Sequence, residues 1–172
     1  MGNGTPRLRA IPTICVALAT CAAAAAVAYP RAEASASSSI RPTSRESALT
    51  ARVNRARASH GLAPLHVDMR LVRAARSHTE AIVSSGVFEH GRFWVWIERE
   101  GVSGGRLAET LGWSAPADGS EARIVAGWLH SQEHRAILLD RRLRDVGIGV
   151  HVGPFKRQPN AVVATADFRG PA

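Results

Sequence analysis

Cysteine is almost absent from this sequence: Cys15 and Cys21 are the only two in 172 residues, and both lie near the N-terminus. If that segment is removed, the mature chain has no thiol, which excludes disulfides and cysteine-ligated metals. Lysine is rarer still, since Lys156 is the only one. We attribute the preference for arginine to genomic composition. The sequence also has no internal repeat, no strand–turn nucleophile elbow and no cofactor motif.

Residues 1–36 have the features of a secretory signal peptide. Two arginines precede the uncharged run IPTICVALATCAAAAAVA, and the small-residue sites AEA and ASA predict cleavage after Ala34 or Ala36. A retained membrane anchor is less favoured, because the run is rich in alanine and only weakly apolar. LATC resembles a lipoprotein cleavage box, so a lipid-bearing N-terminus at Cys21 is the minority alternative.

The mature chain is expected to be positively charged. Residues 37–172 contain 19 basic and 13 acidic side chains, a net charge of +6. A positive secreted protein should associate with anionic envelope polymers or lipid headgroups. Nucleic acid is excluded as a partner, because the signal directs the chain outside and its arginines are scattered. We expect a monomer without a membrane span in its mature form.

Hydrophobic periodicity predicts helices first and strands last. Residues 37–44 are polar and predict a flexible linker. Helical spacing runs from a cap at Ser44 to His60, from a cap at Asp68 to Gly86, and again from about Ser120, with a short helical piece at HRAILLD. Residues 87–119 are interpreted as an irregular connection. VGIGVHV and AVVATADF alternate like strands around a turn, GPFKRQPN, so the fold class is α+β.

Several stretches resemble, in order, the CAP superfamily, named for cysteine-rich secretory proteins, antigen five and plant pathogenesis-related proteins. VNRARASHGLAPLHVDMRL is similar to the family's N-x-x-R and G-L-x-P-L-x-x-D-x-x-L, and SHTEAIVSSGVFEH to its second helix and F-x-H. WLHSQEHRAILLD with DVGIGV is similar to W-x-x-S-x-x-H-R-x-x-I-L and V-G-x-G. The likeness, to the cysteine-free bacterial branch, runs from about Glu46 to Phe168. It implies a domain at residues 45–172 with an α–β–α sandwich and a central antiparallel sheet.

The resemblance also implies a groove lined by histidines and acidic residues. His90 and His134 match the two groove histidines, and Glu109 matches the glutamate of the family's G-E-N segment. Ser131 falls where eukaryotic members have an acidic residue and bacterial members commonly have serine. The chain departs from the pattern twice, with AET in place of G-E-N and SQEHR in place of S-P-G-H-R.

The stretch HSQEH, His130 to His134, also fits the H-x-x-E-H pattern of inverted zinc peptidases. Such an enzyme needs both histidines on one continuous helix, Glu133 as general base, and a third ligand from a later helix. The family match places His134 beyond the end of the helix, and the residues after it are mostly turn and strand. We therefore interpret the five-residue match as accidental.

Two interpretations of the groove stay open. His90 and His134, with Glu109 nearby, suit an open zinc site. The favoured alternative is a water-filled polar groove in which Glu109 fixes the tautomer of a histidine. Two hypotheses of function also stay open. The preferred hypothesis is an extracytoplasmic binding module for a small hydrophobic or cell-envelope ligand, and the alternative is a metal-assisted hydrolase or peptidase with Glu109 as candidate base.

Other conspicuous side chains are expected to be structural. His78 lies on the apolar stripe of the second helix and should be a packed, hydrogen-bonded core histidine. His130 should face solvent. The remaining residues with predicted packing or helix-internal structural roles are Trp128, Asn54 and Arg57. Phe93, Trp94 and Trp96 are expected to pack the loop onto the domain, and the alternative is an aromatic rim that contacts glycan or lipid.

Overall fold

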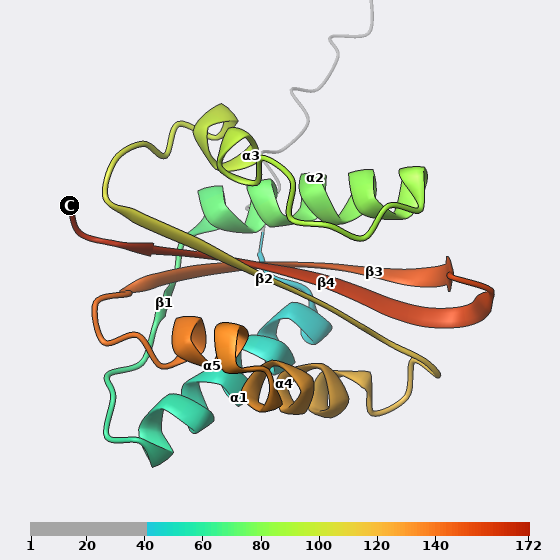
Figure 1. Ribbon diagram of the computed structural model, residues 1–172, viewed down its shortest axis with the longest axis horizontal. Helices are drawn as coiled ribbons and strands as arrows, with labels where there is room; N and C mark the ends of the chain where they lie inside the picture. The colour runs from blue at the N-terminus through green and yellow to red at the C-terminus, as the bar shows by residue number, and fades with distance from the viewer. Residues whose placement is uncertain (1–40) are drawn as a thin grey trace, which may run out of the picture. The chain divides into compact units, whose positions relative to one another are not determined.

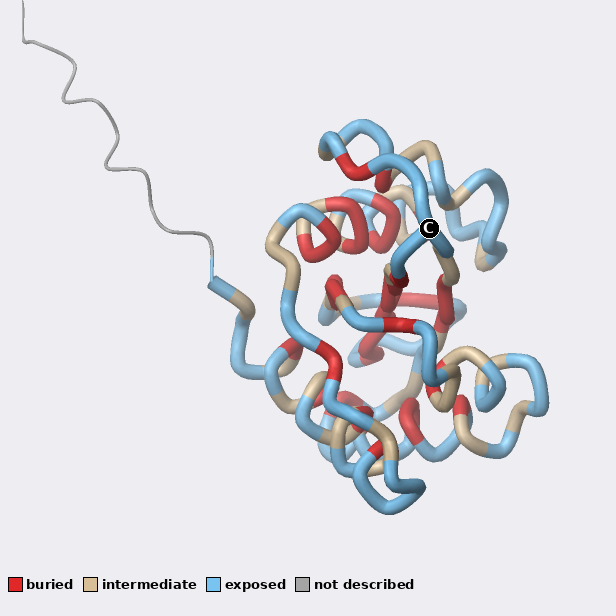
Figure 2. Tube along the Cα trace, turned by 90° about the vertical axis from the view of Figure 1, so that its left-hand side faces the viewer, coloured by how far each residue is buried: buried red, intermediate tan, exposed pale blue. Residues whose placement is uncertain are grey.

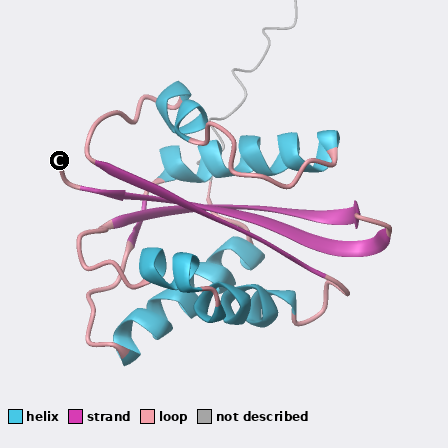
Figure 3. Ribbon diagram, in the orientation of Figure 1, coloured by secondary structure: helices cyan, strands magenta, loops and turns pink. Residues whose placement is uncertain are grey.

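The computed structural model describes residues 41–172, in which a four-stranded sheet lies between two layers of helices (Figures 1 and 3). The elements are α1 (Ser44–Ser59), β1 (His66–Val67), α2 (Met69–Ser85), α3 (Trp94–Arg99), β2 (Arg106–Ser114), α4 (Ser120–His130), α5 (Gln132–Leu138), β3 (Asp145–Phe155) and β4 (Gln158–Gly170). Helices α2 and α3 cover one face of the sheet, and α1, α4 and α5 cover the other (Figure 1). The predicted α–β–α sandwich is confirmed.

Residues 41–172 lie within one compact unit, and the buried hydrophobic clusters lie within it. The expected signal peptide, including Cys21, lies outside the described residues. None of the helices between residues 41 and 172 is both long and apolar enough to cross a membrane.

The strands are ordered β1-β3-β4-β2, which places β2 at one edge of the sheet. The three long strands pair antiparallel, as expected, whereas β1 adds two residues to β3 in parallel. The hairpin between β3 and β4 turns at Lys156 and Arg157 alone, because most of the predicted turn GPFKRQPN continues the two strands.

The segment predicted to be an irregular connection, residues 87–119, contains both α3 and β2. Strand β2 has no alternating pattern because Glu109, Thr110 and Leu111 are buried consecutively. Helices cover both faces of the sheet, so neither face of this strand is uniformly polar.

The first helix begins with a capping box. The Thr43 hydroxyl accepts from the backbone N–H of Glu46, and the Glu46 carboxylate accepts from the Thr43 N–H at 2.6 Å. Ser44 is therefore the first helical residue and not the cap that its sequence position predicted. The expected flexible linker also ends earlier, since the Arg41 carbonyl accepts from the Arg76 guanidinium at 3.0 Å.

The N-x-x-R motif of α1 fastens the loop that follows the helix. The Asn54 side-chain amide bonds both backbone groups of Leu65, at 2.8 and 3.0 Å. Arg57 is 1 % exposed and donates to the carbonyls of Ala63, Leu138 and Asp140. These contacts confirm the structural roles expected for both residues, and Figure 2 shows the buried trace concentrated in the sheet and on the helix turns that face it.

Helix α2 packs unusually close to β3 because two glycines of VGIGV lie beneath it. A Cβ atom at Gly147 would lie 2.0 Å from the carbonyl carbon of Leu71, and one at Gly149 would lie 2.3 Å from the backbone nitrogen of Arg76. No side chain fits in that space. The close approach brings His78, two turns along α2, onto the sheet where Glu109 projects.

Candidate functional site

Glu109, near the middle of edge strand β2, is the centre of a buried polar cluster. It is 3 % exposed and lies on the sheet face that α2 covers. One carboxylate oxygen accepts from His78 Nδ1 at 2.5 Å, and the other accepts from His90 Nδ1 at 2.7 Å. The carboxylate therefore holds two imidazoles, one from α2 and one from the loop after it, each with its proton on Nδ1.

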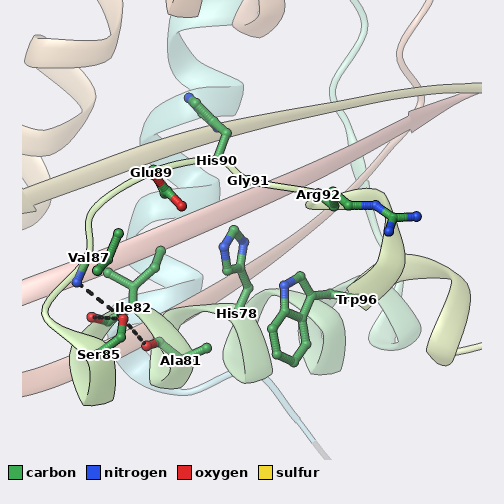
Figure 4. A pocket seen from close by; sticks show the side chains of 10 residues that line it. All are labelled: His78, Ala81, Ile82, Ser85, Val87, Glu89, His90, Gly91, Arg92 and Trp96. Carbon is green, nitrogen blue, oxygen red and sulfur yellow. Dashed lines mark hydrogen bonds between the residues drawn. The ribbon is translucent and has the colours of Figure 1, made fainter.

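His78 is fixed on its other side by an aromatic ring. Its imidazole stacks on Trp96 of α3, with ring centroids 5.6 Å apart and planes inclined by 14° (Figure 4). The Arg99 guanidinium covers the same indole at 4.9 Å from its centroid. The prediction of a packed, hydrogen-bonded histidine is confirmed. Of the neighbouring aromatics, Trp96 packs as expected, whereas Trp94 is 38 % exposed.

Asp167 of β4 lies directly opposite Glu109 in the β2–β4 register. It is fully buried, and neither of its carboxyl oxygens has a hydrogen-bond donor within reach among the described residues. Burial, and then the neighbouring Glu109 carboxylate, raise the pKa of Asp167 well above its usual range. Two buried carboxyl groups side by side favour one shared proton over two negative charges. Asp167 is thus the neutral member of the pair.

Asp167 is a member of the site that the sequence patterns did not predict. The signal was present, since Asp167 occupies the same alternate position of AVVATADF as the buried residues Ala161, Val163 and Thr165. A carboxyl group on the apolar face of a strand needs a partner or a proton. Its partner could not be read from the sequence, because it depends on the pairing register of β2.

His90 and His134 come together from opposite layers of the sandwich, at the edge of the sheet. Their ring centroids lie 6.0 Å apart, with planes inclined by 59°. The hydrogen bond to Glu109 raises the pKa of His90. Burial, and then the proximity of His90, lower the pKa of His134. As pH falls, His90 should therefore gain its proton before His134 does.

Ser131 caps the helix that carries His134. It is the N-cap of α5, and its hydroxyl accepts from the His134 N–H at 3.4 Å. Ser131 also ends α4 in an extended conformation, so His130 and His134 lie on two separate helices. The condition that an inverted zinc peptidase requires is not met. His130 is exposed, as predicted, and its Nδ1 bonds the Ala126 carbonyl.

Two hollows lie beside residues of the expected groove, one between α2, the loop after it and α3, and one between β2 and α4. The first, of about 140 Å³, is lined by His78, His90 and Trp96 (Figure 4). The second, of about 280 Å³, lies against α4 and is lined by Ser131 and His134. Glu109 lies beneath the surface and lines neither of them. Within residues 41–172, no three histidine, aspartate or glutamate side chains are arranged to hold a metal ion together.

Comparisons with known proteins agree with this architecture. The family model described as "Cysteine-rich secretory protein family" matches residues 50–168. The chain therefore belongs to the CAP family, and the resemblance seen in the sequence is confirmed. No curated protein sequence matches it.

Three solved bacterial structures share the fold. An extracellular protein containing an SCP domain from Bacillus anthracis has a TM-score of 0.62 at 20% identity, covering 73% of this chain and 40% of that one. A cysteine-rich secretory protein from Staphylococcus aureus has a TM-score of 0.58 at 21% identity, and the match covers 76% of this chain and 41% of that one. An outer surface protein from Borrelia burgdorferi has a TM-score of 0.61 at 18% identity, and the match covers 77% of this chain and 97% of that one. This chain thus spans about two fifths of the first two proteins and nearly all of the third.

Proposed function

We propose that this CAP domain is a secreted, extracytoplasmic binding module whose histidine–glutamate cluster shapes a ligand pocket and performs no hydrolysis. The observation that carries the proposal is the state of Glu109, which is 3 % exposed with both oxygens already accepting hydrogen bonds. A general base must present a lone pair within reach of a water molecule. Secretion is supported by the leader-like residues 1–36 and by the descriptions of two structural relatives as extracellular and outer-surface proteins.

Of the two hollows beside the histidines, the one against α4 suits a ligand better. Its wall contains the apolar side chains of Leu111, Ile124 and Trp128, and polar groups of Ser131 and His134 also line it. A pocket of about 280 Å³ accommodates a small molecule or one end of a lipid. An apolar surface beside polar groups suits an amphipathic ligand, which agrees with the expected lipid or envelope component.

Gly127 provides a test that does not endanger the fold. It lines this hollow from α4, and a Cβ atom added there would meet nothing within 4 Å. Gly127→Leu should fill the pocket while favouring the helix, because glycine is a poor helix former. The control is Ala126→Leu, an exposed neighbour on the same helix and outside the hollow.

The assay uses residues 37–172, incubated with a bacterial envelope lipid extract and re-isolated, with bound lipid identified by mass spectrometry. The proposal expects lipid on the wild type and on Ala126→Leu but not on Gly127→Leu. Equal lipid on all three proteins, or none on the wild type, would refute the pocket.

Metal binding is the second candidate, and the geometry of His90 favours it. Histidines that ligate metals usually donate their other N–H to a carboxylate, as His90 does to Glu109. His90 and His134 would hold the ion, with Glu109 in the outer shell, and a bound zinc ion would polarise a carbonyl group or activate water. Two nitrogens alone make a weak zinc site.

Calorimetric zinc titration of residues 37–172, beside His90→Ala/His134→Ala, distinguishes the two candidates. The binding-module proposal expects no saturable zinc binding at micromolar concentration. Micromolar binding that the double variant abolishes would establish a metal site and require a screen for hydrolysis.

A further inference from the structure

The hairpin joining β3 and β4 has an unfavourable turn sequence. Both of its central residues have left-handed backbones, with φ of 44° at Lys156 and 65° at Arg157. Two-residue hairpins of this kind favour Asn-Gly, because other side chains are strained at positive φ. Strained backbone that persists in a native protein often marks a functional position. Here it presents the chain's only lysine, and an arginine beside it, at the far end of the hairpin (Figure 1).

Aromatic rings from three elements gather at this turn. The Phe155 ring lies 5.8 Å from Trp113 of β2 and 6.1 Å from Phe88, which follows α2. The Lys156 ammonium lies over Phe88 and Phe155, 5.3 and 5.8 Å from their centroids. We call this group, with Arg157 and Val87, which adjoin Lys156 and Phe88 in the sequence, the hairpin tip. Val87 and Trp113 are 49% and 36% exposed, so apolar surface borders the charges.

The hairpin tip carries no balancing negative charge in its own strands. Between Asp145 and Asp167 the sequence contains no acidic residue, and Glu89, the exposed acidic residue next to Phe88, forms no ion pair with Lys156 or Arg157. Elsewhere in residues 41–172 several arginines form ion pairs, as Arg73 does with Glu100, whereas no such pair is formed by Lys156 or Arg157. The tip is therefore both cationic and apolar.

We propose that the hairpin tip docks the domain onto an anionic lipid bilayer. The exposed side chains of Trp113 and Val87 would enter the boundary between headgroups and acyl chains, where tryptophan is favoured, while Lys156 and Arg157 pair with lipid phosphates. The inference deepens the proposed function and rests on it in one respect: Trp113 also lines the ligand hollow, so the docked domain would take its lipid from that bilayer.

The decisive variant is Lys156→Asn/Arg157→Gly, which removes both charges and installs the sequence that this turn prefers. It should fold at least as stably as the wild type. The matched control is Arg55→Gln/Arg141→Gln, which removes the same charge at two exposed positions. Binding of residues 37–172 is measured by co-sedimentation with vesicles of phosphatidylglycerol and phosphatidylcholine, and with phosphatidylcholine alone.

The wild type should bind the anionic vesicles and bind phosphatidylcholine much less. Each basic residue near an anionic surface contributes about fivefold, so the tip variant should bind roughly 30-fold more weakly and the control close to normally. Equal losses in the two variants, or no binding by the wild type, would overturn the proposal.

A second variant separates a bilayer from a soluble polyanion. Val87→Ser removes apolar surface without changing the charge. It should weaken vesicle binding several-fold and leave binding of inorganic polyphosphate unaltered. Vesicle binding unaffected by Val87→Ser would mean that the tip recognises phosphate charge alone, and bilayer docking would be wrong. Gly127→Leu keeps the tip intact and should still bind vesicles, so failure of the lipid pocket and failure of docking are distinguishable.

Discussion

Replacing Asp167 with asparagine should stabilise the domain, although the side chain is fully buried. In the native state burial and Glu109 raise the pKa of Asp167, so the folded protein holds a proton that the unfolded chain releases above about pH 4. Stability of the wild type therefore falls as pH rises from about 4 to the raised native pKa, by about 1.4 kcal/mol per pH unit for this group. Asparagine is neutral at every pH and retains an N–H that can donate to Glu109.

Urea unfolding of residues 37–172 from pH 4 to pH 9 tests this reasoning. The stability gained by Asp167→Asn should grow with pH at about that slope and then level off above the native pKa of Asp167. In a Glu109→Gln background the gain should shrink, because one of the two causes of the raised pKa is gone. A gain that is independent of pH, or a variant less stable than the wild type throughout, would refute the shared-proton description of the centre.

Three further predictions address the rest of the domain. Glu109→Gln removes the negative charge of the acceptor that raises the pKa of His90, so NMR titration should find that pKa lowered; an unchanged value would contradict the assigned contact. Gly147→Ala should destabilise by about 3 kcal/mol, through overpacking against α2, while Gly127→Ala should stabilise by up to about 1 kcal/mol in urea unfolding. Burial raises the pKa of Glu46, but hydrogen bonds from Arg76 and Thr43 outweigh it and lower that pKa. The stability that the Glu46 carboxylate provides should therefore be lost as pH falls below about 4.5, and Glu46→Gln should reduce this loss of stability in acid. An unaltered loss would exclude the ion pair as its source.

Much of the fold follows from local patterns in the sequence. The helices are predicted by apolar spacing and by stop signals such as Gly86, and the β3–β4 hairpin is predicted by alternation. Strand β2 was not predictable in this way, because it is covered on both faces and carries Glu109 on a buried face.

The candidate site, too, could be predicted only in part. Motif likeness predicted His90, Glu109 and His134, and the structure brings these three into one chain of contacts. Periodicity placed His78 in the core without identifying its partner. The pairing of Glu109 with Asp167 depends on strand register, which distant packing determines, so no local pattern contains it.

The central claim is that the domain binds a ligand and that the buried cluster around Glu109 does not catalyse. It is tested most directly by comparing the wild type with Glu109→Gln for both lipid capture and hydrolysis of that same envelope extract, with circular dichroism to verify folding. We predict lipid on both proteins and no hydrolysis by either. Turnover by the wild type that Glu109→Gln abolishes, with the fold intact, would contradict the account and establish a hydrolase.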